Sequence, residues 1–265
     1  MIEPLKSSDI TQPSSTVTLN ASTIAGHVAE YIEGKQLNAH QLVGIGTDGA
    51  AVMTEKNNGV VKKLQEFATT AIGIHCSAHR LQLASCQAAN AVPFVKKFHT
   101  ILRQLYDYYD NSAVRMAGLH AVQTALGEKV LKPIQPSSTR WLSIEMSTTR
   151  LKESYVSILV SLEREGEERG DVKAVGFFHL LSSYRFIATM LLLCDLLPHV
   201  SRLSKAFQAR EFEYSQLKPL VTSTISTIQK MKSVDADNLQ KLPQFITNLE
   251  KSDIVVKERA DEKNI

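Results

Sequence analysis

The stretch LVGIGTDG, which runs from Leu42 to Gly49, decides the fold that this sequence predicts. Its apolar residues follow one another without polar alternation, which is typical of a strand that is covered on both faces. The Gly-Thr-Asp-Gly at its end is a turn signal. We therefore expect Asp48 at the carboxyl end of a buried strand.

Similar segments on either side of this strand alternate with helical patterns. Short runs at 16–19 and 71–74 predict two more strands, and apolar residues at helical spacing follow each strand, the first after a cap at Asn20. This order predicts an α/β sheet with parallel crossovers. From Val92 to Met231 nearly every segment is helix-like, so a mostly α-helical domain should follow. We expect a flexible N-terminus at 1–15, a partial α/β core at 16–91, a helical domain at 92–235 and a charged C-terminal helix or tail at 236–265.

Composition places the chain among folded intracellular proteins. With 265 residues, 43% of them hydrophobic, it can bury a substantial core. The formal net charge is only +3, so contact with DNA must come from a local basic patch. Three cysteines without a Cys-x-x-Cys pair argue against a secreted disulfide framework. The apolar stretch Phe186–Leu197 contains Asp195 and is too short to span a bilayer, so we expect a buried helix and no membrane contact.

Asp48 is the first candidate functional residue. Ligands in α/β sheets gather beyond the carboxyl ends of strands, and a carboxylate there suits Mg²⁺, which prefers hard oxygen ligands. Paired ions that act on a phosphodiester need several such carboxylates. Thr-Asp-Gly is also a common turn, in which Asp accepts a backbone hydrogen bond. The residues by themselves favour this turn.

His75, Cys76 and His79 form a second constellation. The Cys-x-x-His spacing places two ligands for a soft metal on one face of the first turn of a helix. A closed zinc site needs four ligands, and Cys86 and His99 lie at irregular spacings that supply no second pair. The residues therefore favour a packed pair that orients the helix over a zinc site. The His-x-Glu and Cys-x-x-Cys signature of zinc deaminases is absent.

Arg140 and the only tryptophan, Trp141, follow a Pro/Ser/Thr turn. Tryptophan can stack on an unpaired base while the neighbouring arginine neutralises a phosphate, whereas a lone tryptophan is more often a core anchor. A set of basic residues could likewise face DNA or form an ordinary solvated surface. The set comprises Lys56, Lys62, Lys63, Arg80, Lys96, Lys97 and Arg103.

Five sequence motifs follow one another along the chain. They are Val43–Met53, Asn57–Val61, Ile74–Ala84, Thr139–Ser143 and Leu196–Ser204 with the nearby Phe207-Gln208. Together they resemble hAT-family transposases and their domesticated vertebrate relatives. The resemblance extends to about Met231.

The resemblance implies an α/β fold with a partial RNase H-like core, followed by a helical insertion-type domain. Asp48 then matches the second acidic residue of a metal-binding triad, a relic of a catalytic site that binds Mg²⁺ weakly. Cys76 and His79 match a structural Cys-x-x-His element of the family. Trp141, beside Arg140, matches an aromatic residue that holds a flipped base. This analogy favours an active-site remnant over a simple turn at Asp48.

The other two acidic residues of the triad have no counterpart here, and Asp9, in a Ser/Pro context, is a poor substitute. We also expect the opening hairpin, the zinc-finger domain and the oligomerisation region of the family to be missing. The resemblance therefore predicts a transposon-derived nuclear protein that is not an enzyme, needs no cofactor and binds DNA or other proteins; Mg²⁺ would matter only to a completed catalytic core. One alternative is a fragment of an active DNA transposase, and another is a protein-interaction scaffold without DNA binding.

Overall fold

The computed structural model of the chain describes residues 20–137, 141–209 and 213–257. The chain divides into two compact units, Met1–Arg80 and Leu81–Ile265, which we call the N-terminal and C-terminal units. The division falls within helix α4 (Ser77–Ala91). The segment at 1–15, for which the sequence predicts flexibility, lies outside the described residues.

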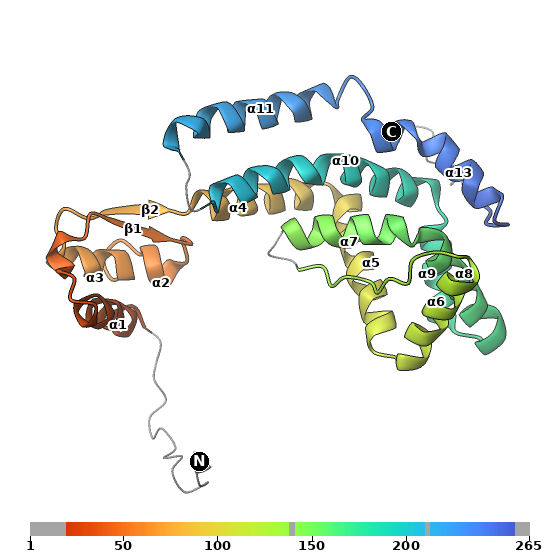
Figure 1. The fold of residues 1–265 in the computed structure, drawn as a ribbon, viewed down its shortest axis with the longest axis horizontal. Coiled ribbons are helices and arrows are strands. Elements are labelled where there is room, and N and C mark those ends of the chain that lie inside the picture. Colours follow the sequence, from red (N-terminus) through yellow and green to blue (C-terminus); the bar gives the residue numbers. More distant parts are fainter. Residues whose placement is uncertain (1–19, 138–140, 210–212, 258–265) are drawn as a thin grey trace, which may run out of the picture. The chain divides into compact units, whose positions relative to one another are not determined.

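The N-terminal unit consists of short helices and two parallel strands (Figure 1). Its elements in order are α1 (Ala21–Gly34), the 3-10 turn η2 (Ala39–Gln41), β1 (Gly44–Thr47), α2 (Ala51–Thr54), α3 (Val60–Phe67) and β2 (Ile72–His75). The predicted cap at Asn20 is confirmed, because its side-chain oxygen accepts a 2.9 Å hydrogen bond from the Thr23 amide. The strands pair in parallel from Gly44 with Ile72 to Thr47 with His75.

The α/β, partly RNase H-like fold class that the sequence predicts is wrong. The described residues are mostly helical, and their one sheet has two strands of four residues each. The strand predicted at 16–19 lies outside the described residues. Two short strands do not make the multi-stranded layer of an α/β core.

The sequence predicts that the strand after Leu42 is covered on both faces. Among the described residues, helices cover only one face of the strands. In Figure 1, α1, α2 and α3 lie on one side of the two strands, and Ile72 and Ile74, which share one face of β2, are 65% and 59% exposed. The apolar run misled the prediction because two of its positions are Gly44 and Gly46, which carry no side chain. Successive residues of a strand face opposite sides, so these glycines hide the fact that only one face has a covering layer.

The C-terminal unit is helical, as the patterns after Asn90 predict. Its elements in order are α5 (Pro93–Asp110), α6 (Ala113–Ala125), α7 (Trp141–Glu153), α8 (Tyr155–Arg169), α9 (Val172–Leu181), α10 (Tyr184–Phe207), the 3-10 turn η3 (Tyr214–Gln216), α11 (Leu217–Lys230), α12 (Asp237–Gln240) and α13 (Leu242–Glu250). Local chemistry sets several boundaries. Pro93 opens α5, the side chains of Ser112, Asp171 and Ser183 cap α6, α9 and α10, and Gly170 ends α8 at φ +62°.

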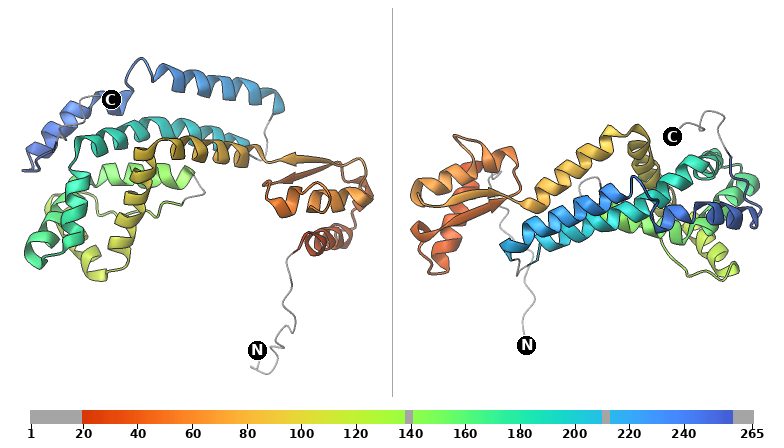
Figure 2. Two further views of the ribbon diagram at one scale, coloured as in Figure 1. Left: turned by 180° about the vertical axis from the view of Figure 1, so that it is seen from behind. Right: turned by 90° about the horizontal axis from the view of Figure 1, so that it is seen from above.

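Helix α10 is the central element of the C-terminal unit. The side chains of Phe186, Ile187 and Met190 are at most 1% exposed and pack in a core shared with other helices of the unit. In the views of Figure 2, α10 runs beside α11. By length and composition alone α10 could cross a membrane, but half of its apolar stretch is buried inside the unit, in agreement with the buried helix predicted for Phe186–Leu197.

Asp195 is buried within this apolar helix and caps a neighbouring one. Its carboxylate accepts hydrogen bonds of 3.0 Å from the backbone amides of Asn238 and Leu239, at the start of α12. The Asn238 side-chain oxygen accepts from the ammonium group of Lys152 in α7. Because a buried carboxylate needs such donors, this network joins α7, α10 and α12.

Candidate functional site

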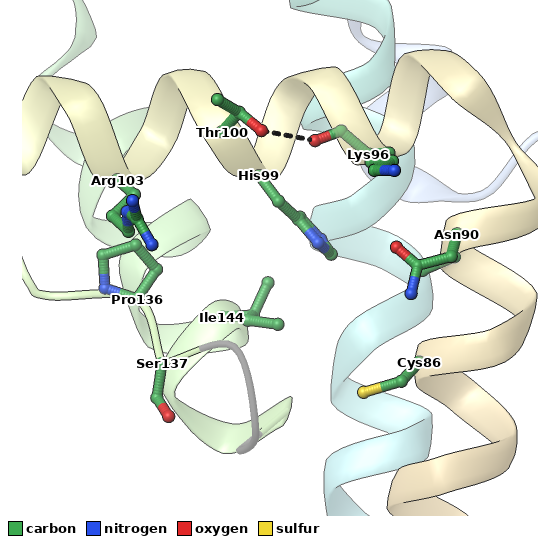
Figure 3. Close-up of a pocket in the computed structure, with 10 residues that line it drawn as sticks. Cys86, Asn90, Lys96, His99, Thr100, Arg103, Pro136, Ser137 and Ile144 are labelled. Atoms are coloured by element: carbon green, nitrogen blue, oxygen red, sulfur yellow. Dashed lines mark hydrogen bonds between the residues drawn. The ribbon is translucent and has the colours of Figure 1, made fainter.

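A cavity of about 270 Å³ lies in the C-terminal unit between the end of α4, one face of α5 and the segment that precedes α7 (Figure 3). Lys96, His99 and Arg103 line it from α5, and Figure 3 shows the His99 side chain extending from this helix into the cavity. Cys86 and Asn90 line it from α4. The cavity therefore combines cationic, amide and imidazole groups.

Helical periodicity explains why α5 contributes these three side chains. Residues three and seven positions apart lie on the same face of a helix, which groups Lys96 with His99 and Arg103. The opposite face carries Phe98, Leu102 and other side chains that are buried in the core of the unit. Burial of that face fixes the rotation of α5, so the cationic face is held toward the cavity.

The third wall belongs to a segment that is tied to α7. The backbone amide of Ser137 donates a 2.8 Å hydrogen bond to the Ser143 hydroxyl. Pro136 is buried, and Ile144 is only 3% exposed at the floor of the cavity. This wall is therefore held by a hydrogen bond and by packing on the core.

The cavity carries positive charge without compensation. The residues that line it include no Asp or Glu. Lys96 and Arg103 are exposed and make no ion pair with any carboxylate among the described residues. Burial lowers the pKa of His99 below its ordinary value, so its ring is neutral near pH 7 and can donate or accept a hydrogen bond.

This arrangement is suited to binding an anion. Arginine presents a planar fork of donors to a phosphate or carboxylate, and lysine adds a mobile point charge. The neighbouring amide of Asn90 supplies a further donor. A phosphate group satisfies all three, because its oxygens are strong acceptors that can be shared among several donors.

The predicted pair Arg140–Trp141 belongs to the same part of the chain. Arg140 lies outside the described residues, as does the Trp141 side chain, although Trp141 is the first residue of α7. Two residues that line the cavity, Ser137 and Ile144, flank this pair in the sequence. Trp141 therefore opens the helix that supplies Ile144 to the cavity.

Asp48 lies just after β1, at the strand's carboxyl end, as the sequence predicts. Its side chain is exposed, and its Oδ1 accepts a 3.0 Å hydrogen bond from the amide of Ala50. This is the turn geometry that the residues alone favour. No three His, Cys, Asp or Glu side chains gather as a metal-binding group within the described ranges. Magnesium binding and a catalytic origin for Asp48 stay predictions.

His79 packs on His75, and the predicted structural role of Cys76 with His79 stays a prediction. The two imidazole rings lie 5.5 Å apart with an interplanar angle of 35°. Cys76 is exposed, and its amide donates a 2.7 Å hydrogen bond to the carbonyl of Thr47. His79 thus anchors the start of α4 through His75, while Cys76 contributes through its backbone.

Sequence reasoning missed that Cys86 and His99 lie at one cavity. Both appear at irregular spacings in the sequence, but the end of α4 and the first turns of α5 bring them to the same walls as Lys96 and Arg103. The spacing of positions 96, 99 and 103 was the available signal, since it places these three residues on one helical face. Nothing in the sequence indicates which elements cover that face.

No protein-family model matches the chain, and no solved structure matches it.

Proposed function

We propose that this chain is a transposon-derived protein that binds the phosphate backbone of DNA through the cavity at Lys96, His99 and Arg103. The observation that carries the proposal is a concave site with two uncompensated cations and no lining carboxylate. Phosphate contacts of this kind supply most of the affinity of proteins for nucleic acids. A formal net charge of only +3 is compatible with such a local site.

The resemblance at Arg140 and Trp141 supports a nucleic-acid ligand over a small anion. The resemblance to hAT transposases assigns Trp141 to an unpaired base, and residues on either side of it in the chain line the cavity. Stacking of a base on an aromatic ring contributes about 1–3 kcal/mol. Phosphates in the cavity and a base at Trp141 would be parts of one ligand.

The proposed role is binding without catalysis, in the nucleus and without a cofactor. Of the three acidic positions in the family's triad, the resemblance finds a match only for Asp48. A single carboxylate does not clamp the two metal ions that phosphodiester exchange requires.

Binding of the purified chain to a fluorescent hairpin DNA tests the proposal. Anisotropy measured between roughly 50 and 200 mM NaCl gives the slope of log K against log salt concentration, which steepens by about 0.9 for each phosphate contact. We expect Lys96→Gln with Arg103→Gln to make this slope shallower by about 2. Trp141→Ala should weaken binding to a hairpin with unpaired bases more than binding to a fully paired duplex.

Lys218→Gln with Lys230→Gln is the matched control, because it removes the same charge from exposed positions of α11 in the same unit. The control should keep the wild-type slope. If the wild-type chain does not bind at low salt, the proposal fails and the interaction scaffold becomes the better hypothesis. If both double variants change the slope equally, binding is diffuse and the cavity is not the site.

A further inference from the structure

A second cavity of the C-terminal unit, of about 500 Å³, also gathers positive charge. Lys97 lines it from α5, Arg185 from the start of α10, and Lys257 from the segment that follows α13. His179, near the end of α9, lies beside them. The residues that line this cavity include no Asp or Glu.

Among the described residues, no carboxylate pairs with any of these three cations, Lys97, Arg185 and Lys257. Like charges that share a concave surface raise its potential and draw anions into it. The cavity is therefore electrostatically prepared for an anionic ligand.

The position of Lys257 is built by backbone hydrogen bonds. Its amide donates to the carbonyl of Ser182 at 3.0 Å, and its carbonyl accepts from the amide of Tyr184 at 3.2 Å. Its ammonium group lies 3.3 Å from Nδ1 of His179. Because an ammonium has three donors and no acceptor, Nδ1 accepts one N–H and the other two remain for a ligand.

Arg185 is oriented by an aromatic ring. Its guanidinium carbon lies 4.3 Å from the centroid of the Phe94 ring. Stacking on a ring face leaves the in-plane N–H groups of a guanidinium free to form hydrogen bonds, and none of these groups bonds to another described residue. The N–H groups of Arg185 are thus held in a fixed orientation and can donate hydrogen bonds to a ligand.

The amino terminus of α10 adds to the same potential. Ser183, which caps this helix, lines the cavity together with Phe186 of the first turn. The amino end of a helix carries a partial positive charge that favours anions. The side-chain cations and the amino terminus of α10 therefore both raise the electrostatic potential in the second cavity.

Both cavities border the same helix. Lys96 and Lys97 are neighbours in α5, and successive residues of a helix lie about 100° apart around its axis. The first cavity takes the face with His99 and Arg103, and the second takes the face with Phe94 and Ile101 on the other side of the helix. Helix α5 therefore contributes cationic side chains to two cavities, one on each side of the helix.

We propose that the second cavity is a further phosphate-binding site, which holds another segment of the nucleic-acid backbone that contacts the first. This inference rests on the proposed function, and it specifies that the backbone crosses α5. The ligand class is a phosphodiester, recognised by Lys97, Arg185 and Lys257.

The test compares salt dependence among double variants on the same hairpin DNA. Lys97→Gln with Lys257→Gln should make the slope of log K against log salt shallower by about 2, and combination with Lys96→Gln and Arg103→Gln should make it shallower by about 4. Lys218→Gln with Lys230→Gln again serves as the charge-matched control. Circular dichroism checks the fold, and Lys97→Gln alone, which should change the slope by about 1, is the second variant if the Lys257 change unfolds the chain.

The outcomes separate the two proposals. If the first-cavity variants change the slope and the second-cavity variants do not, the second site is wrong and the proposed function stands. If only the second-cavity variants change it, the second site is supported and the first cavity is wrong as a DNA site. If wild-type binding persists unchanged in both sets, both assignments are overturned.

Discussion

The N-terminal and C-terminal units differ in how much apolar surface they bury. In the C-terminal unit, buried side chains from most of its long helices converge on α10. Among the described residues of the N-terminal unit, the buried cluster consists of Ala25, Val60 and Leu64, with partly buried neighbours such as Ile45. The open face of its sheet leaves Ile72 and Ile74 exposed.

This difference in buried apolar surface predicts that the two units differ in stability. A two-stranded sheet with helices on one face lacks the second covering layer that parallel strands normally have. We therefore expect the N-terminal unit to unfold at a lower free energy than the C-terminal unit. Both proposed phosphate sites lie in the better-packed unit, which can hold their cations in place.

The largest effect on stability is expected when a buried side chain in the core of the C-terminal unit is shortened. Phe98 is fully buried, and its ring lies 4.8 Å from that of Phe186. Phe98→Ala should lower the free energy of unfolding of the C-terminal unit by about 3–5 kcal/mol. Urea unfolding followed by the fluorescence of Trp141, the only tryptophan, reports on this unit.

Phe67→Ala, in the N-terminal unit, is the corresponding control. Phe67 is partly buried against the small cluster of that unit, so its loss should leave the Trp141 transition unchanged. An equal shift of that transition in both variants would mean that the two units unfold as one.

A smaller effect is expected at the turn that carries Asp48. Gly49 has φ +82°, and a Cβ there would lie 2.3 Å from Nε2 of His75. Gly49→Ala should destabilise the N-terminal unit by about 1–3 kcal/mol, measured as faster amide hydrogen exchange in β1 and β2. Gly46→Ala is the control, because its Cβ would meet no atom within 4 Å. Equal exchange rates in the two variants would contradict the packing of His75 on this turn.

A pH-dependent effect of intermediate size is expected at Asp171. Burial would raise the pKa of its carboxyl, but hydrogen bonds from the Ala174 and Lys173 amides and the Tyr108 hydroxyl outweigh it. Together with the nearby Arg115 guanidinium, they hold the pKa below its ordinary value. A lowered pKa in the folded state stabilises the protein above the unfolded-state pKa, and this contribution is lost as pH falls through the folded-state pKa.

Asp171→Asn keeps a capping oxygen but removes the charge, so it should cost about 1 kcal/mol at pH 7. The difference in Tm between wild type and variant should shrink as pH falls below 3.8, the ordinary value for the carboxyl. A difference that stays constant down to the acid transition would show that the charge contributes nothing.

The smallest effect on stability is expected from Ile72→Thr with Ile74→Thr. These changes also test whether this face of the two strands is exposed to solvent. Both side chains are mostly exposed, so the free energy of unfolding should change by less than about 0.5 kcal/mol. Binding of a hydrophobic dye should decrease, because the exposed apolar patch is reduced. Ile45→Thr, on the covered face, should destabilise the unit instead. Equal destabilisation by the two changes would show that the open face is covered in solution.

Local sequence chemistry determined much of this protein. The caps at Asn20, Asp171 and Ser183, the proline that opens α5 and the buried character of α10 all follow from residues within a few positions of one another. Asp48 lies at the end of β1 because a Gly-rich turn must follow the apolar run. Such features depend on short-range backbone hydrogen bonds and on side-chain periodicity. Both can be predicted from residues that are close together in the sequence.

Tertiary structure alone decided which faces are covered and which side chains share a site. Periodicity shows that a face is buried but does not name the element that covers it, so the sequence predicted a second layer over β1 that the described residues do not form. The same holds for the cavities: Cys86 and His99 line one cavity, and the Lys257 ammonium group lies beside Nδ1 of His179, only because of the way their elements pack. Docking is set by the shape and apolar area of whole elements, and that information is spread over the entire chain.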